Sequence, residues 1–109
     1  MTITKGDKHE FSVAVTDNVG AVMDLSGMTM TFTAKDSITK LDAEADISAT
    51  AVIATPSSGI GAFTLLPADT TIDVKDYFYD VQISDGANAV YTVIKDSTLT
   101  ITNQVTINP

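Results

Sequence analysis

Apolar and polar residues alternate along much of this chain, most clearly in segment 24–34. A turn of sequence Asp-Leu-Ser-Gly leads there into four apolar residues that are separated by threonines. Side chains of a β-strand point to opposite faces in turn, so we expect one face to meet a core and the other to meet water. The inward residues are Met28, Met30, Phe32 and Ala34, and the outward residues are Thr29, Thr31 and Thr33.

Comparable patterns predict further short strands with turn residues between them. The predicted strands are 9–16, 47–53, 60–66, 76–84, 89–95 and a closing strand that contains Leu99, Ile101, Val105 and Ile107, with turns at 17–20, 56–59, 85–88 and Asp96-Ser97. Residues 41–46 are also compatible with the start of a helical turn, and we favour a loop there. Pro67 opens a single predicted helical turn over 67–71 that bridges two sheets. We expect the closing strand to bend or bulge at Asn103-Gln104.

Seven or eight short strands at regular spacing are typical of an all-β sandwich or barrel, and we expect residues 1–109 to form one such domain. Composition agrees, because threonine is abundant while leucine, glutamate and arginine are sparse or absent. One local pattern resembles the tyrosine corner of immunoglobulin domains, because Asp73 precedes Tyr77 by four residues at the start of a predicted strand. Tyr79 then takes the place of the cysteine that follows the corner tyrosine in those domains.

The charge of the chain narrows the classes of partner. The sequence has 12 Asp, 2 Glu, 6 Lys and no Arg, for a net charge of -8. Such a chain repels nucleic-acid phosphates and anionic lipid surfaces, so we expect neither nucleic acid nor a membrane as a partner. No cysteine is present, which excludes disulfides and thiolate metal sites. The first residues show no basic region followed by an apolar run, so we expect a soluble protein made without a secretory signal.

One acidic segment raises the hypothesis of a weak calcium site. Asp42, Glu44 and Asp46 alternate with alanines and would share one face of an extended segment. Carboxylate oxygens are the ligands that calcium prefers, but the carboxylate spacing and the glycine of a dedicated calcium loop are absent. We therefore favour a solvated loop and expect no metal site and no cofactor.

Other chemistry-bearing residues are isolated in the predicted fold. His9 is the only histidine, and we expect it to be exposed at the outer end of the first strand. Asp73 and Asp76 flank a predicted corner of the sheet without an aromatic platform, so turn roles are favoured over a glycosidase pair. No glycine-rich phosphate loop is present. We therefore expect no catalytic residues.

Two aromatic residues are candidates for an interface. Aromatic side chains contribute large contact areas at low entropic cost. In the predicted strand 76–84, Phe78 points to the face opposite Tyr77 and Tyr79, and Tyr91 lies in the following strand. We therefore name Phe78 and Tyr91 as candidate interface residues.

Several runs of sequence resemble small immunoglobulin-like proteins of tailed bacteriophages. They are Ile-Thr-Lys-Gly-Asp at 3–7, Phe-Ser-Val-Ala-Val-Thr-Asp at 11–17, the segment 24–32, Gly-Ala-Phe-Thr-Leu at 61–65 with Pro-Ala-Asp-Thr at 67–70, and Tyr-Phe-Tyr-Asp-Val-Gln-Ile at 77–83 with Asp85-Gly86. Over nearly its whole length the chain is similar to the N-terminal domain of phage upper-baseplate proteins and to single-domain virion accessory proteins. The resemblance implies an immunoglobulin-like β-sandwich of seven or eight strands.

The resemblance also implies a non-enzymatic structural role in a virion. The expected protein decorates the capsid, or is a tail or baseplate accessory, and acts through protein-protein contacts. Its expected partners are major capsid, tail or baseplate subunits, and association with copies of itself stays open. Its expected location is the virion, after synthesis in the host cytoplasm. A carbohydrate-binding or adhesion module is the alternative, and a small hydrolase is a third class that the single histidine disfavours.

Overall fold

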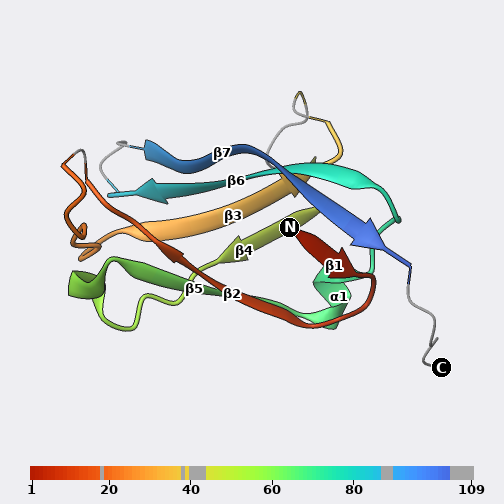
Figure 1. Cartoon of the computed structure of the whole chain (residues 1–109), viewed down its shortest axis with the longest axis horizontal. Helices are drawn as coiled ribbons and strands as arrows, with labels where there is room; N and C mark the ends of the chain where they lie inside the picture. The colour runs from red at the N-terminus through yellow and green to blue at the C-terminus, as the bar shows by residue number, and fades with distance from the viewer. Residues whose placement is uncertain (18, 38, 40–43, 87–89, 104–109) are drawn as a thin grey trace.

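Two facing β-sheets make up the described part of the chain. A computed structural model describes residues 1–17, 19–37, 39, 44–86 and 90–103. Its elements are β1 (Thr2–Thr4), β2 (His9–Ala14), β3 (Thr29–Lys35), β4 (Ile47–Thr50), the 3-10 turn η2 (Pro56–Ser58), β5 (Ile60–Leu65), α1 (Pro67–Thr70), β6 (Asp76–Ser84) and β7 (Val90–Thr102). The larger sheet has the order β1-β7-β6-β3-β4, and the smaller sheet pairs β2 with β5 (Figure 1). The predicted all-β sandwich is confirmed.

The strand order is that of an immunoglobulin-like sandwich. In this order β2 and β5 take the places of strands B and E, and β3, β6 and β7 take those of strands C, F and G. β2 pairs with β5, and β6 pairs with both β3 and β7, all in antiparallel fashion. In contrast, β1 runs parallel to β7 at the edge of the larger sheet. The predicted central strand is β6, which lies between β7 and β3.

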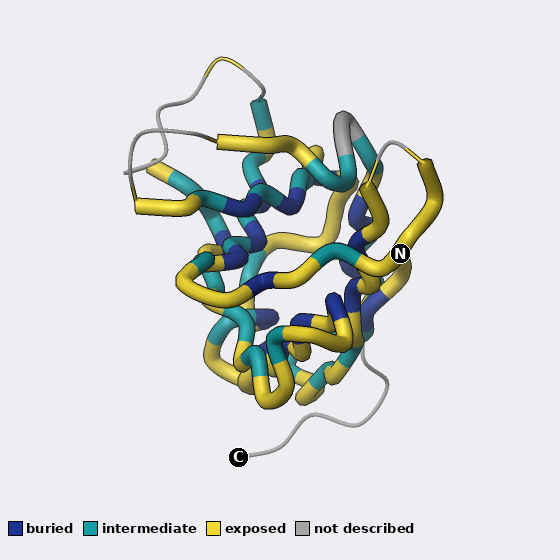
Figure 2. Tube along the Cα trace, turned by 90° about the vertical axis from the view of Figure 1, so that its left-hand side faces the viewer, coloured by how far each residue is buried: buried dark blue, intermediate teal, exposed yellow. Residues whose placement is uncertain are grey.

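The alternating sequence of β3 sets its two faces. Met30, Phe32 and Ala34 are buried, whereas the threonines between them remain at least partly exposed. The same alternation holds in β5, where Phe63 and Leu65 are buried. Figure 2 views the sandwich from its end and shows the buried segments between the two layers. The inward and outward residues predicted within β3 are therefore confirmed.

Aromatic rings join the two sheets in the core. Phe11 of β2 stacks on Phe63 of β5 with 5.1 Å between the ring centroids, and meets Phe32 of β3 edge-on at 5.5 Å. Tyr79 of β6 extends this cluster, with its ring centroid 5.2 Å from that of Phe32. Offset and edge-to-face contacts of this kind add to the stabilisation that burial provides. The cluster therefore fixes the small sheet against the large one.

Tyr77 forms a tyrosine corner where the chain crosses between the sheets. Its side chain is 2% exposed, and its hydroxyl donates a 2.7 Å hydrogen bond to the backbone carbonyl of Asp73. The crossing starts with α1, whose buried Thr70 donates its hydroxyl to the carbonyl of Asp7 at 2.7 Å. Burial raises the pKa of Tyr77 above its ordinary value. The tyrosine corner and the bridging helical turn are both confirmed.

Two features of the larger sheet differ from the prediction. The expected break at Asp96-Ser97 is wrong, because β7 runs without interruption from Val90 to Thr102. Its register with β6 shifts between the pairs Tyr79/Ser97 and Val81/Ile94, so a bulge accommodates the polar residues within the strand. The edge strand β1 was not predicted, because three residues are too few to show an alternating pattern.

The remaining differences concern lengths and limits of elements. The strand predicted at 47–53 ends at Thr50, and Val52 forms an isolated bridge with Ala62 of β5, which links the two sheets at this side. Residues 41–43, the second half of the turn at 85–88, and the closing strand from Gln104 onward lie outside the described residues.

We expect Tyr77→Phe to lower the free energy of unfolding by about 1 to 2 kcal/mol, because it leaves the Asp73 carbonyl without its donor. The variant should also lose less stability at alkaline pH than the wild type. Since the folded pKa of Tyr77 is raised, its contribution is fully present below the ordinary tyrosine pKa of 10.0 and is lost as the pH rises through the folded value. Urea unfolding at neutral and alkaline pH measures both effects. Tyr91→Phe, at an exposed position, is the control, and equal losses in both variants would contradict the prediction.

Candidate functional site

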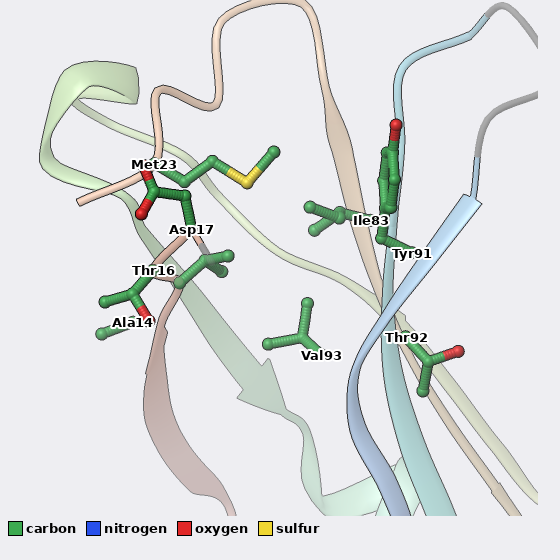
Figure 3. A pocket seen from close by; sticks show the side chains of 9 residues that line it. Ala14, Thr16, Asp17, Met23, Ile83, Tyr91, Thr92 and Val93 are labelled. Carbon is green, nitrogen blue, oxygen red and sulfur yellow. The ribbon is translucent and has the colours of Figure 1, made fainter. Parts of the chain in front are cut away.

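An open pocket of about 530 Å³ lies at the end of the sandwich that is opposite α1. It is bordered by residues 14–17, which include the end of β2, by Met23, by Ile83 of β6 and by residues 91–93 of β7. Its apolar lining comes from Met23, Ile83, Tyr91 and Val93. Figure 3 shows Met23 reaching from its loop toward Ile83 and Tyr91, and Val93 pointing into the space between the strands. The pocket opens where a loop, and not a further strand, faces the larger sheet.

Tyr91 forms the aromatic side of this pocket. It lies directly opposite Ile83 in the ladder of β6 and β7, so both side chains belong to the inner face of the sheet. Ile83 is 1% exposed, whereas Tyr91 is 52% exposed. Tyr91 is thus an inner-face aromatic residue that the smaller sheet does not cover. Its role in an interface stays a prediction, and the structure places it beside an apolar pocket.

The loop that carries Met23 is held in place by backbone contacts near Gly59. The N–H of Val15 donates to the Gly59 carbonyl at 2.8 Å, and the N–H of Met23 donates to the Val15 carbonyl at 3.1 Å. A Cβ on Gly59 would lie 2.7 Å from Val22 Cγ1, 2.8 Å from the Met23 carbonyl oxygen and 2.9 Å from that of Val15. Gly59 also has a φ of 68°, in the left-handed region. Only glycine fits this close approach without displacing the loop.

One carboxylate lines the pocket, and two more follow lining residues in the sequence. Asp17 lines it and accepts hydrogen bonds on Oδ1 from the N–H groups of Val19 and Ala21, at 2.9 Å and 3.0 Å. Asp24 follows Met23, and hydrogen bonds from Ser26 hold the pKa of Asp24 below its ordinary value. Asp85 follows β6 in the hairpin. All three carboxyl side chains are exposed, so this end of the molecule is acidic.

Basic side chains are concentrated at the other end. No lysine or arginine occurs between residues 9 and 34 or between residues 76 and 94. Lys5 follows β1, Lys8 precedes β2, Lys35 ends β3 and Lys75 precedes β6, which places these four at the end where α1 lies. Lys75 also forms an ion pair with Asp36 at 3.0 Å, and this hydrogen bond raises the pKa of Lys75.

Phe78 lies on the outer face of the larger sheet, as predicted. It is 44% exposed and lies between Lys35 of β3 and Thr98 of β7 in the ladder. Tyr91 belongs to the inner face near the other end of the same sheet. The structure therefore does not bring the two candidate interface residues together.

The acidic segment is only partly within the described residues. Asp42 lies outside them, while Oδ2 of Asp46 accepts a 2.8 Å hydrogen bond from the N–H of Asp36. Within the described ranges, no group of three or more His, Asp or Glu side chains is arranged to hold a metal ion. The Asp46 carboxylate therefore joins the start of β4 to the end of β3, and the calcium hypothesis gains no support from it.

His9 and the aspartates of the corner have roles within the fold. The expectation that His9 is exposed is wrong, because odd-numbered residues of β2 face inward and the His9 ring lies 5.7 Å from that of Phe11. Asp76 Oδ1 accepts a 2.7 Å hydrogen bond from the hydroxyl of Thr100, which ties β6 to β7. The carbonyl of Asp73 accepts the Tyr77 hydroxyl in the corner, so Asp73 has the predicted turn role, whereas Asp76 pairs two strands.

Three pocket residues were missed as candidates from the sequence. Ile83 and Val93 read as ordinary strand residues, and Met23 lies in a segment with no regular pattern. The available signal was an isolated long apolar side chain between two turns, at Met23. That signal does not reveal what the side chain faces, because the pocket forms only when the loop meets the hairpin.

Comparisons with known proteins add no family assignment: no family model matches the chain, and no curated protein matches it. Among the described residues, no helix has the length and apolar character of a membrane span. Function therefore has to be inferred from the surface features and from the sequence pattern.

We expect Gly59→Ala to lower the free energy of unfolding by about 2 to 3 kcal/mol, because the new methyl group meets two carbonyl oxygens and the backbone is strained. Gly27→Ala is the matched control, since Gly27 also has a positive φ but no atom lies within 4 Å of its Cβ position. Its expected loss is about 1 kcal/mol, from strain alone. Chemical denaturation of the two variants measures the difference, and equal losses would show that the close approach at Gly59 is unimportant.

Proposed function

We propose that the protein is a non-enzymatic structural component of a tailed-phage virion, a capsid decoration protein or a tail or baseplate accessory, that acts through protein-protein contacts. The sequence resemblance supports this proposal, and the immunoglobulin-like strand order is consistent with it. A sandwich with a closed core leaves its loops and outer faces to bind neighbours.

The observation that carries the proposal is the apolar character of one end of the sandwich. Val19 and Val22 in the loop after β2, and Val90 and Tyr91 at the start of β7, are all exposed. Tyr91 lines the pocket together with Met23, while Val22 directly precedes Met23 and Val90 directly precedes Tyr91 in the sequence. Exposed apolar side chains gathered around a pocket are typical of a surface that binds another protein. The proposed partners are capsid, tail or baseplate subunits.

A carbohydrate-binding or adhesion module is the second candidate, and Phe78 favours it. The Phe78 ring lies on an open sheet face whose neighbouring strands carry rows of threonine hydroxyls, including Thr98 and Thr100 of β7 and Thr31 and Thr33 of β3. An exposed aromatic ring among hydroxyl groups can stack on a sugar ring while the hydroxyls exchange hydrogen bonds with it, the Thr100 hydroxyl as an acceptor because it already donates to Asp76. This surface is separate from the pocket.

Co-sedimentation tests the virion proposal. The purified protein is incubated with capsids and, separately, with tails of the phage that encodes it, prepared without this protein. We expect saturable binding to one of them because a decoration or accessory protein must recognise repeated subunits. Capsid binding would identify a decoration protein, and tail binding a tail or baseplate accessory. Binding to neither particle would refute the proposal.

A glycan array separates the second candidate from the first. The carbohydrate proposal requires binding that Phe78→Ala abolishes and Tyr91→Ala leaves unchanged, because the two side chains lie on different faces. We expect no glycan to bind under conditions in which virion particles do. A saturable glycan signal that depends on Phe78 would favour the adhesion function.

A further inference from the structure

We propose that the pocket between the loop after β2 and the β6–β7 hairpin binds a basic segment of a partner protein, in which lysine or arginine side chains flank an apolar anchor. This inference deepens the proposed function and rests on it, since it names the surface and the chemistry of the partner. The combination of an apolar lining with an acidic border supports it.

The lining of the pocket suits an apolar anchor. Met23, Ile83 and Val93 present aliphatic or thioether surface, and Tyr91 adds an aromatic wall. Methionine adapts its shape to different apolar partners. A volume of about 530 Å³ lies in the range of pockets that take up a large side chain or a short segment of chain. The pocket thus accepts the kind of central anchor that dominates binding energy in protein interfaces.

The aspartates in and next to the pocket favour a partner with positive charge. Asp17 lines the pocket, Asp24 directly follows Met23, and Asp85 comes two residues after Ile83. No lysine or arginine occurs between residues 9 and 34 or between 76 and 94. Aspartate carboxylates are ionised at neutral pH, and hydrogen bonds from Ser26 lower the pKa of Asp24 further. An acidic segment would meet like charges here, whereas lysine or arginine side chains would meet opposite charges.

Basic side chains also match the pocket in shape. Lysine and arginine lay their aliphatic stems along apolar surface while their charged ends stay in water near carboxylates. The exposed ring of Tyr91 offers a face on which a cation can be held. A second copy of this chain fits less well, because its lysines at the α1 end lie among acidic residues and two of them form the ion pairs Lys8–Glu10 and Lys75–Asp36.

Three short synthetic peptides test the charge and the anchor separately. The first alternates lysine with leucine and phenylalanine, the second has glutamate in place of each lysine, and the third has serine in place of each apolar residue. Backbone amide NMR of the labelled full chain follows each titration. We expect saturable chemical-shift changes at residues 14–17, 23, 83 and 91–93 with the first peptide only. This binding should be weaker at about 0.5 M salt than at about 0.05 M salt. Equal binding of the glutamate peptide, or shifts outside these residues, would overturn the inference.

Two matched variants test the site itself. Tyr91→Ala removes the aromatic wall and is expected to weaken binding of the first peptide about tenfold. Val74→Ala removes an exposed apolar side chain before β6, at the other end of the molecule, and is expected to leave binding unchanged. Both positions are exposed, so both variants should fold. Unchanged binding by Tyr91→Ala would refute the pocket as the site.

The same variants in the particle assay separate this inference from the proposed function. Binding of the wild type but not of Tyr91→Ala to capsids or tails supports both the virion function and the pocket as the contact. Equal binding of both proteins refutes the pocket as the contact and leaves the virion function standing. Peptide binding without any particle binding refutes the virion function while the site remains. Concentration-dependent dimerisation that Tyr91→Ala abolishes would assign the pocket to a second copy and overturn the basic partner.

Discussion

A sheet of two strands has to cover one face of a sheet of five strands, and this mismatch shapes the molecule. The aromatic cluster of Phe11, Phe63, Phe32 and Tyr79 places the small sheet over the middle of the large one. The two ends then need other cover. At one end α1 and the buried Tyr77 complete the core, and at the other a loop does so only in part. The closed core at the α1 end and the open pocket at the other end therefore both follow from the small size of the two-stranded sheet.

The strands and turns around the opening account for its apolar lining and for the aspartates near it. Inner-face positions of β6 and β7 are apolar by the strand pattern, so any part that stays uncovered presents an apolar surface. The turn residues that reverse the chain nearby include aspartates, because aspartate hydrogen-bonds to the backbone of its own turn, as Asp17 and Asp24 do. An apolar floor with an acidic border is therefore a direct product of strand and turn chemistry. No dedicated binding motif is needed to produce it.

Much of the fold could be predicted from the sequence, but the pocket could not. The alternation in β3 and β5, the helical turn after Pro67 and the pairing of Tyr77 with Asp73 are local patterns, and the structure has each of them. β7 was divided in two because Asp96-Ser97 reads as a turn when the opposite strand is unknown. The signal at Met23, a long apolar side chain between two turns, does not show that Met23 lines a pocket together with residues of β7, far along the chain. The sequence singles out Tyr91 by its aromatic chemistry alone, and only the tertiary structure places it beside the pocket.

The edge strand β1 also imposes an order on folding. Thr2 pairs with Thr100 and Ile3 with Ile101, so the first of the described strands binds the last of them. Closing a loop of nearly the whole chain costs conformational entropy before any contact compensates for it. During synthesis on the ribosome, the buried side chain of Ile3 has no partner strand until β7 has emerged. The hairpins can form as they leave the ribosome, and the joining of β1 to β7 is the step that completes the domain.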